Sequence, residues 1–135
     1  MDKLDQEIVS ILEERGRAPY TDIADELDVS EGTVRNRVEQ LQEEGTIKRF
    51  TVDVAEEDTF SVVVMVDLEP GQEIDNILSA LPEQLDVYEV TGEYDMVLQF
   101  NRPSSRALNE VLEDIRKVDG VQNTHTYTVL ASHSR

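Results

Sequence analysis

Apolar residues recur at helical spacing in three short segments at the start of the chain. The first pattern stops near Gly16, and the second begins at Pro19 and Thr21. The third follows Ser30, a residue type that caps helix N-termini well, and ends at Gly45. Three helices whose last two are joined by a tight turn form a helix-turn-helix. The inward-facing residues are expected to be Leu4, Ile8, Ile11, Leu12, Ile23, Ala24, Leu27, Val34, Val38 and Leu41.

The pattern then changes to the period of β-strands. Residues 47–54 look extended and can serve as a wing and as the exit from the first domain, which spans residues 1–52. A short acidic linker at residues 53–59 precedes a second domain at residues 60–135. Its order of strands and helices, βαββαβ, predicts an α+β, ferredoxin-like fold with both helices on one side of an antiparallel sheet. Strands are expected at residues 60–68, 87–90, 96–100 and 121–131, and helices around residues 74–81 and 108–118.

The strand at residues 60–68 is apolar on both of its faces. Val62, Val64 and Val66 lie on one face, and Val63 and Met65 lie on the other. The two helices cover only one face of such a sheet. The other face is therefore expected to meet its copy in a homodimer, which also supplies the two-fold symmetry that paired half-sites on DNA require.

The third helix carries the residue types that read DNA. In the major groove arginine can chelate guanine, asparagine can pair with adenine, and a threonine methyl can touch thymine. Basic residues beside the groove would hold phosphates without reading sequence. Candidate contacts on the helix are Ser30, Glu31, Gly32, Thr33, Arg35, Asn36 and Arg37, and candidate phosphate contacts are Arg15, Arg17, Lys48 and Arg49.

Exposed arginines can also be salt-bridge partners within one helix, and Arg35 and Glu39 have the right spacing. The distribution of charge favours DNA. Residues 1–52 contain 13 acidic and 7 basic residues, and residues 53–135 contain 17 and 5. Residues 32–38 contain two arginines and no acid. The predicted reading face is thus locally free of acidic residues, and double-stranded DNA is the expected partner.

The whole chain carries 30 acidic and 12 basic residues, a net charge of −18. A hydrophobic content of 39% argues against disorder, so the dispersed acids indicate a solvated coat suited to concentrated salt. An ordinary acidic protein from dilute cytoplasm is the alternative. The N-terminus lacks a signal pattern, and no apolar run is long enough to span a membrane. We therefore expect a cytoplasmic protein without a membrane partner. The lack of cysteine excludes disulfides and thiolate metal sites.

Several motifs together resemble the N-terminal domain of Lrp/AsnC (feast/famine) transcriptional regulators, and the resemblance continues through residues 90–95. It implies a member whose second domain is a RAM-type dimerisation and effector domain, with dimers that assemble further, for example into octamers. It also implies regulation by an amino acid or a related small molecule. The acidic composition departs from the family pattern and predicts a salt-adapted, haloarchaeal-type member. The matching motifs are Leu4-Asp5, Ile8, Ile11-Leu12, Gly16-Arg17, Ile23-Ala24, Val29-Ser30, Thr33-Val34-Arg35-Asn36-Arg37, Gly45-Thr46-Ile47 and Val90-Thr91-Gly92-Glu93-Tyr94-Asp95.

In Lrp/AsnC proteins the loop that matches residues 91–95 lines a site where an amino acid binds between subunits. The resemblance therefore makes Gly92, Glu93, Tyr94 and Asp95 effector-site candidates, with carboxylates for an α-ammonium and backbone N–H groups for an α-carboxylate. The alternative is a structural turn in which Asp95 binds nearby backbone N–H groups. Thr126, on a face that Thr124 and Thr128 share, is a further candidate beside the same site, and a plain β-propensity ladder is the alternative.

Nothing in the sequence points to catalysis. His125 and His133 are the two histidines, and neither has the spacing of a metal pair or a nucleophile partner. We expect no enzyme activity, no metal and no cofactor. The predicted function is a site-specific, dimeric transcriptional regulator. The alternative is a metabolite-sensing or protein-interaction module whose helix-turn-helix no longer contacts DNA. In molar salt the release of counterions contributes little to DNA affinity, so base contacts must dominate binding.

Overall fold

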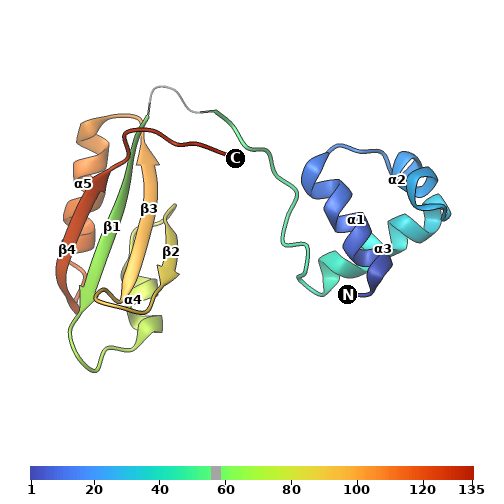
Figure 1. The fold of residues 1–135 in the computed structure, drawn as a ribbon. Coiled ribbons are helices and arrows are strands. Elements are labelled where there is room, and N and C mark those ends of the chain that lie inside the picture. The colour runs from blue at the N-terminus through green and yellow to red at the C-terminus, as the bar shows by residue number, and fades with distance from the viewer. Residues whose placement is uncertain (56–58) are drawn as a thin grey trace. The chain divides into compact units, whose positions relative to one another are not determined.

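The computed structural model describes residues 1–55 and 59–135. The chain divides after Ala55 into two compact units, here called the N-terminal and C-terminal units (Figure 1). The predicted linker spans this division, and its residues 56–58 lie outside the described residues. Within the described parts of the chain, no helix has both the length and the apolar character needed to cross a membrane.

The N-terminal unit consists of three helices, as predicted. They are α1 (Lys3–Glu14), α2 (Tyr20–Leu27) and α3 (Glu31–Glu43). The side chain of Ser30 accepts the N–H of Thr33 and caps α3, while Gly45, with φ of 77°, lies just beyond its end. The helices enclose a small core of Ile8, Ile11, Ile23, Ala24, Val34 and Val38.

The predicted wing does not form. Residues 47–55 carry neither helix nor strand, and no described strand pairs with them. Phe50 is 48% exposed and Val52 is 75% exposed. The alternation in residues 47–54 thus correctly predicted an extended segment. A strand also needs a hydrogen-bonding neighbour, and the described residues supply none.

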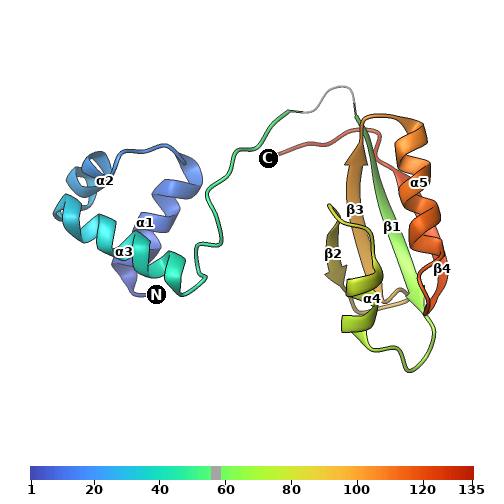
Figure 2. The ribbon, with the colours of Figure 1, turned by 180° about the vertical axis from the view of Figure 1, so that it is seen from behind.

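The C-terminal unit has the predicted ferredoxin-like fold. Its sheet has the order β2-β3-β1-β4, and every neighbouring pair is antiparallel. Both helices lie on one side of the sheet (Figures 1 and 2). The last strand ends at Thr128, earlier than predicted, although the N–H of Val129 still donates to Ser61. The elements are β1 (Phe60–Leu68), α4 (Ile74–Ala80), β2 (Asp86–Glu89), β3 (Met96–Arg102), α5 (Ser105–Arg116) and β4 (Val121–Thr128).

The two faces of β1 have different surroundings. Val62, Val64 and Val66 are buried under α4 and α5, in a core that includes Leu98 and Ile115. The opposite face, which we call the open face, carries Val63, Met65, Tyr88, Val97 and Tyr127. Val63, Met65 and Val97 are only partly buried, and the two tyrosines are more than half exposed.

Candidate nucleic-acid interface and effector loop

The buried residues of α3 fix which side chains face outward. Val34 and Val38 are fully buried, and successive residues on a helix are about 100° apart. Asn36 therefore lies opposite the core and is exposed, with Gly32 one turn before it on the same side. Arg35 and Arg37 lie on the two flanks of this outward strip.

Arg35 is held on its own helix and beside α2. Its guanidinium donates to Glu31, and it lies 5.4 Å from the ring centroid of Tyr20. The alternative raised from the sequence, an ion pair within the helix, is thus present at Arg35, with Glu31 and not Glu39 as its partner. An acid four residues before a base suits the helix dipole better than one four residues after it, which explains the choice of Glu31. This pair raises the pKa of Arg35 further above its ordinary value.

Arg37 reaches away from α3 to the start of α1. Its guanidinium binds the carboxylates of Asp2 and Asp5, the latter at 3.1 Å. The Arg37 side chain is 32% exposed and that of Asp5 only 14%. Asp2 accepts hydrogen bonds from the Arg37 guanidinium and from the N–H of Asp5. These bonds hold the pKa of the Asp2 carboxyl below its ordinary value. The reading face is free of acids in the sequence, but folding brings two carboxylates to it, which corrects that prediction.

The other DNA candidates have different surroundings. Arg17, Lys48 and Arg49 are exposed, whereas Arg15 donates to Glu26 at 2.6 Å. The hydroxyls of Ser30 and Thr33 lie 2.8 Å apart and bond to each other at the start of α3.

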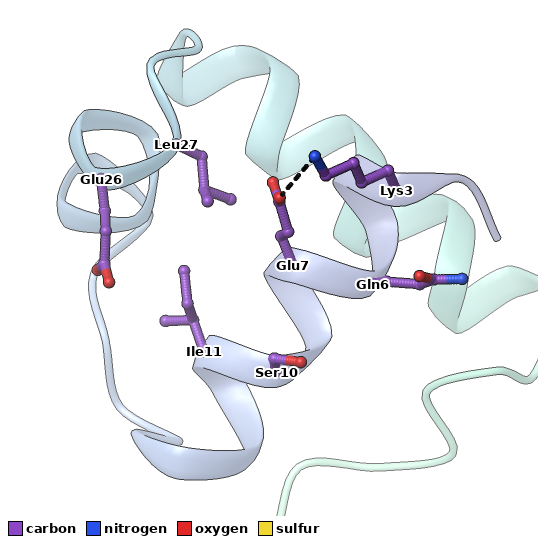
Figure 3. Close-up of a pocket in the computed structure, with 7 residues that line it drawn as sticks. All are labelled: Lys3, Gln6, Glu7, Ser10, Ile11, Glu26 and Leu27. Atoms are coloured by element: carbon purple, nitrogen blue, oxygen red, sulfur yellow. Dashed lines mark ion pairs between the residues drawn. The ribbon is translucent and has the colours of Figure 1, made fainter.

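Lys48 and Arg49 border an open hollow of about 540 Å³ on the N-terminal unit. A second hollow of about 580 Å³ lies between α1 and α2, where Lys3 and Glu7 are 4.0 Å apart (Figure 3). It contains none of the predicted DNA contacts. The residues that line the second hollow are Lys3, Gln6, Glu7, Ser10, Ile11, Glu26 and Leu27.

The predicted effector loop connects β2 to β3 and is bonded to the end of β1. The carboxylate of Asp95 accepts the N–H of Leu68 at 2.7 Å, and its own N–H donates to Val66 at 2.9 Å. Gly92 has φ of 116°, a conformation that favours glycine. Asp95 therefore has a structural role in the turn, the alternative raised by the sequence. The carboxylate also borders an open hollow of about 490 Å³.

The structure separates Thr126 from this loop. Thr126 pairs with Val64 in the register of the sheet, so it lies on the helix-covered side. Its neighbour His125 lies on the open face, where its ring meets that of Tyr94 at a centroid distance of 5.5 Å. The correct residue to group with the loop is thus His125. Burial, followed by the charge of Glu93, raises the pKa of the Tyr94 hydroxyl.

Replacing Asp95 with alanine should destabilise the protein by about 1–2 kcal/mol, because the N–H of Leu68 loses a charged acceptor. Asp95→Asn keeps an acceptor oxygen and should cost less than half as much. Urea unfolding followed by circular dichroism measures both changes. Equal stability of all three proteins would contradict the structural role of this carboxylate.

The two units match two parts of one known architecture. Residues 1–42 match the AsnC-type helix-turn-helix domain, and residues 61–135 match the Lrp/AsnC ligand binding domain. The chain belongs to the Lrp/AsnC family of transcriptional regulators. It is thus a DNA-binding regulator and not an enzyme, in agreement with the sequence prediction.

Relatives of this regulator align over nearly their whole length. The HTH-type transcriptional regulator FL11 of Pyrococcus horikoshii is 35% identical, over 98% of this chain and 91% of FL11. LysM of Sulfurisphaera tokodaii is 38% identical, over 96% of this chain and 95% of LysM. A solved structure, the feast or famine regulatory protein from M. tuberculosis complexed with L-methionine, is 28% identical with a TM-score of 0.86. That similarity covers 99% of this chain and 95% of the other.

Proposed function

We propose that this regulator recognises a specific DNA sequence through the N-terminal half of α3. The observation that carries the proposal is the exposed strip of Gly32 and Asn36, flanked by Arg35 and Arg37, on a helix capped by Ser30. Asparagine suits adenine, and the absence of a side chain at Gly32 allows the backbone to approach the bases. The exposed basic residues Arg17, in the loop between α1 and α2, and Lys48 and Arg49, after α3, would bind phosphates. Glu31 and Thr33 would lie at the groove edge beside them.

A homodimer formed through the open face would present two such helices. The open face has Val63 and Met65 at its centre and the half-exposed rings of Tyr88 and Tyr127 at its sides. This mixture of aliphatic and aromatic residues is typical of the cores of homodimer interfaces. Two-fold pairing would match a palindromic operator. Dimers would assemble further, an octamer being one such assembly.

An amino acid is the proposed effector. The M. tuberculosis relative was solved with L-methionine, and residues 61–135 match a ligand binding domain. Gly92, Glu93, Tyr94 and Asp95 are the proposed contacts, and the hollow beside Asp95 offers space for a small molecule. His125, which touches Tyr94, takes the place of Thr126 in this proposal.

The acidic composition of the chain supports a salt-rich cytoplasm as its working environment. The net charge of −18 includes acids on both units, and screening in molar salt reduces their mutual repulsion. Under those conditions DNA affinity would depend on base contacts more than on counterion release.

The test is selection of bound fragments from random duplex DNA in 2 M KCl, with and without each of the twenty amino acids. We expect a two-fold symmetric sequence to be enriched, and one amino acid to change its affinity. The double variant Arg35→Ala with Arg37→Ala should bind that sequence at least about 100-fold more weakly, because both arginines beside the exposed strip of α3 are lost. Unchanged binding by the double variant would contradict reading by α3. Enrichment of no sequence at all would favour a protein-interaction module.

A further inference from the structure

We propose that Arg37 is a positioning residue for DNA reading and not itself a DNA contact: by bridging Asp2 and Asp5 it fixes the recognition helix α3 against the N-terminus of α1. The direction in which Asn36 points then depends on this bridge. The proposal rests on the proposed function of α3 as the reading helix.

The first argument is that Asp2 and Asp5 each bind both the backbone at the start of α1 and the guanidinium of Arg37. Asp2 and Asp5 form a reciprocal capping box at the start of α1. Oδ1 of Asp2 accepts the N–H of Asp5 at 2.9 Å, and Oδ2 of Asp5 accepts the N–H of Asp2 at 3.3 Å. The remaining oxygen of each carboxylate binds Arg37. The backbone cap therefore orients both acids, and they in turn orient the guanidinium.

The second argument is the charge around Arg37. The guanidinium and its two carboxylates sum to −1, so the cluster repels a phosphate or an electronegative base edge. To contact DNA, Arg37 would first have to leave two charged acceptors, one of which is largely buried. An arginine already bound to two carboxylates of another helix is better suited to link the two helices than to contact DNA.

Arg35 provides the contrast within the same helix. Its ion pair with Glu31 has no net charge, is more exposed than the Arg37 cluster, and lies within α3. Its one described contact outside α3 is with the ring of Tyr20. Opening the pair with Glu31 breaks no ion pair between helices. Arg35 is thus free to exchange Glu31 for a base edge, whereas Arg37 is not.

The test compares two variants that each remove one acidic partner of an ion pair, Asp2 beside Arg37 and Glu7 beside Lys3. Asp2→Ser deletes a partner of Arg37 but keeps a good N-cap residue, so α1 retains its cap. Glu7→Gln deletes the partner of Lys3 on the same helix, outside the proposed DNA contacts, and is the matched control with the same change in charge. The readout is the specificity ratio, the affinity for the duplex selected by the wild-type chain divided by that for a random duplex of equal length, in 2 M KCl.

We expect Asp2→Ser to lower the specificity ratio about tenfold, because α3 is less well placed to read bases. Glu7→Gln should leave the ratio unchanged. If Arg37 were a DNA contact, losing a competing acid would free it, and Asp2→Ser would raise the ratio. That result, or an unchanged ratio, would overturn the proposal.

A double-mutant cycle gives a second measurement that does not depend on Asp2→Ser alone. If Arg37 acts only through its acids, Arg37→Gln combined with Asp2→Ser should lose no more specificity than Arg37→Gln alone. Losses that multiply would overturn the proposal. Thermal unfolding by circular dichroism verifies that each variant is folded. If the wild-type chain selected no sequence, the proposed function would fail, and this inference with it. A selected sequence with an unaffected Asp2→Ser variant would overturn this inference alone.

Discussion

Replacing Val63 with aspartate should convert the regulator into a monomer and weaken operator binding at least about 100-fold. Val63 lies at the centre of the open face, between Gln99 on β3 and Tyr127 on β4. In the proposed dimer an aspartate there would be buried without a partner, at a cost of several kcal/mol. A monomer would also lose the gain in affinity from binding two half-sites at once. Light scattering in 2 M KCl measures the mass of the protein in solution. Titration with the selected duplex measures its affinity for DNA.

The matched control for this variant is Asn109→Asp, which adds the same charge at an exposed position of α5. It should leave both mass and binding unchanged. The Val63 variant itself should remain folded, because the residue lies outside the core of Val62, Val64 and Val66. A dimeric Val63→Asp protein would show that the interface lies elsewhere.

Local sequence patterns were sufficient to predict most of the fold. The 3.6-residue period of Val34, Val38 and Leu41 identifies the buried side of α3, and Ser30 fixes where the helix starts. The apolar residues on both sides of β1 likewise predict a sheet with one covered and one open face. Each of these signals depends on neighbours within a few positions, so no knowledge of the tertiary structure is needed.

The surroundings of the candidate site depended on contacts distant in sequence. Arg37 meets Asp2 and Asp5 across more than thirty residues, and no periodicity predicts that approach. Alternation showed that His125 and Thr126 lie on opposite faces, but only the pairing of β4 with β1 shows which one faces Tyr94. One signal was present and missed. Asp2 and Asp5, three residues apart before an apolar pattern, resemble a capping box.

Replacing Gly120 with alanine should destabilise the C-terminal unit by about 2–5 kcal/mol. Gly120 has φ of 99°, which strains any residue with a Cβ atom by about 1–2 kcal/mol. A Cβ there would lie 2.4 Å from Oε1 of Gln72 and 2.8 Å from Cδ1 of Ile77. The end of the Gln72 side chain can move away, but Ile77 is only 1% exposed and has little room, so overpacking adds about 1–3 kcal/mol. Urea unfolding followed by circular dichroism measures the loss.

Gly71→Ala separates the two contributions to this loss of stability, backbone strain and overpacking. Gly71 also has a positive φ, 81°, but nothing lies within 4 Å of a Cβ at that position. Its substitution should cost only the backbone strain of about 1–2 kcal/mol. Adding Gln72→Ala to the Gly120 variant should recover the part of the loss that comes from Gln72 and leave the part that comes from Ile77. Equal losses for the two glycine variants would show that the core around Ile77 yields to the added methyl group. Backbone conformation alone would then explain why a glycine occupies the turn before β4.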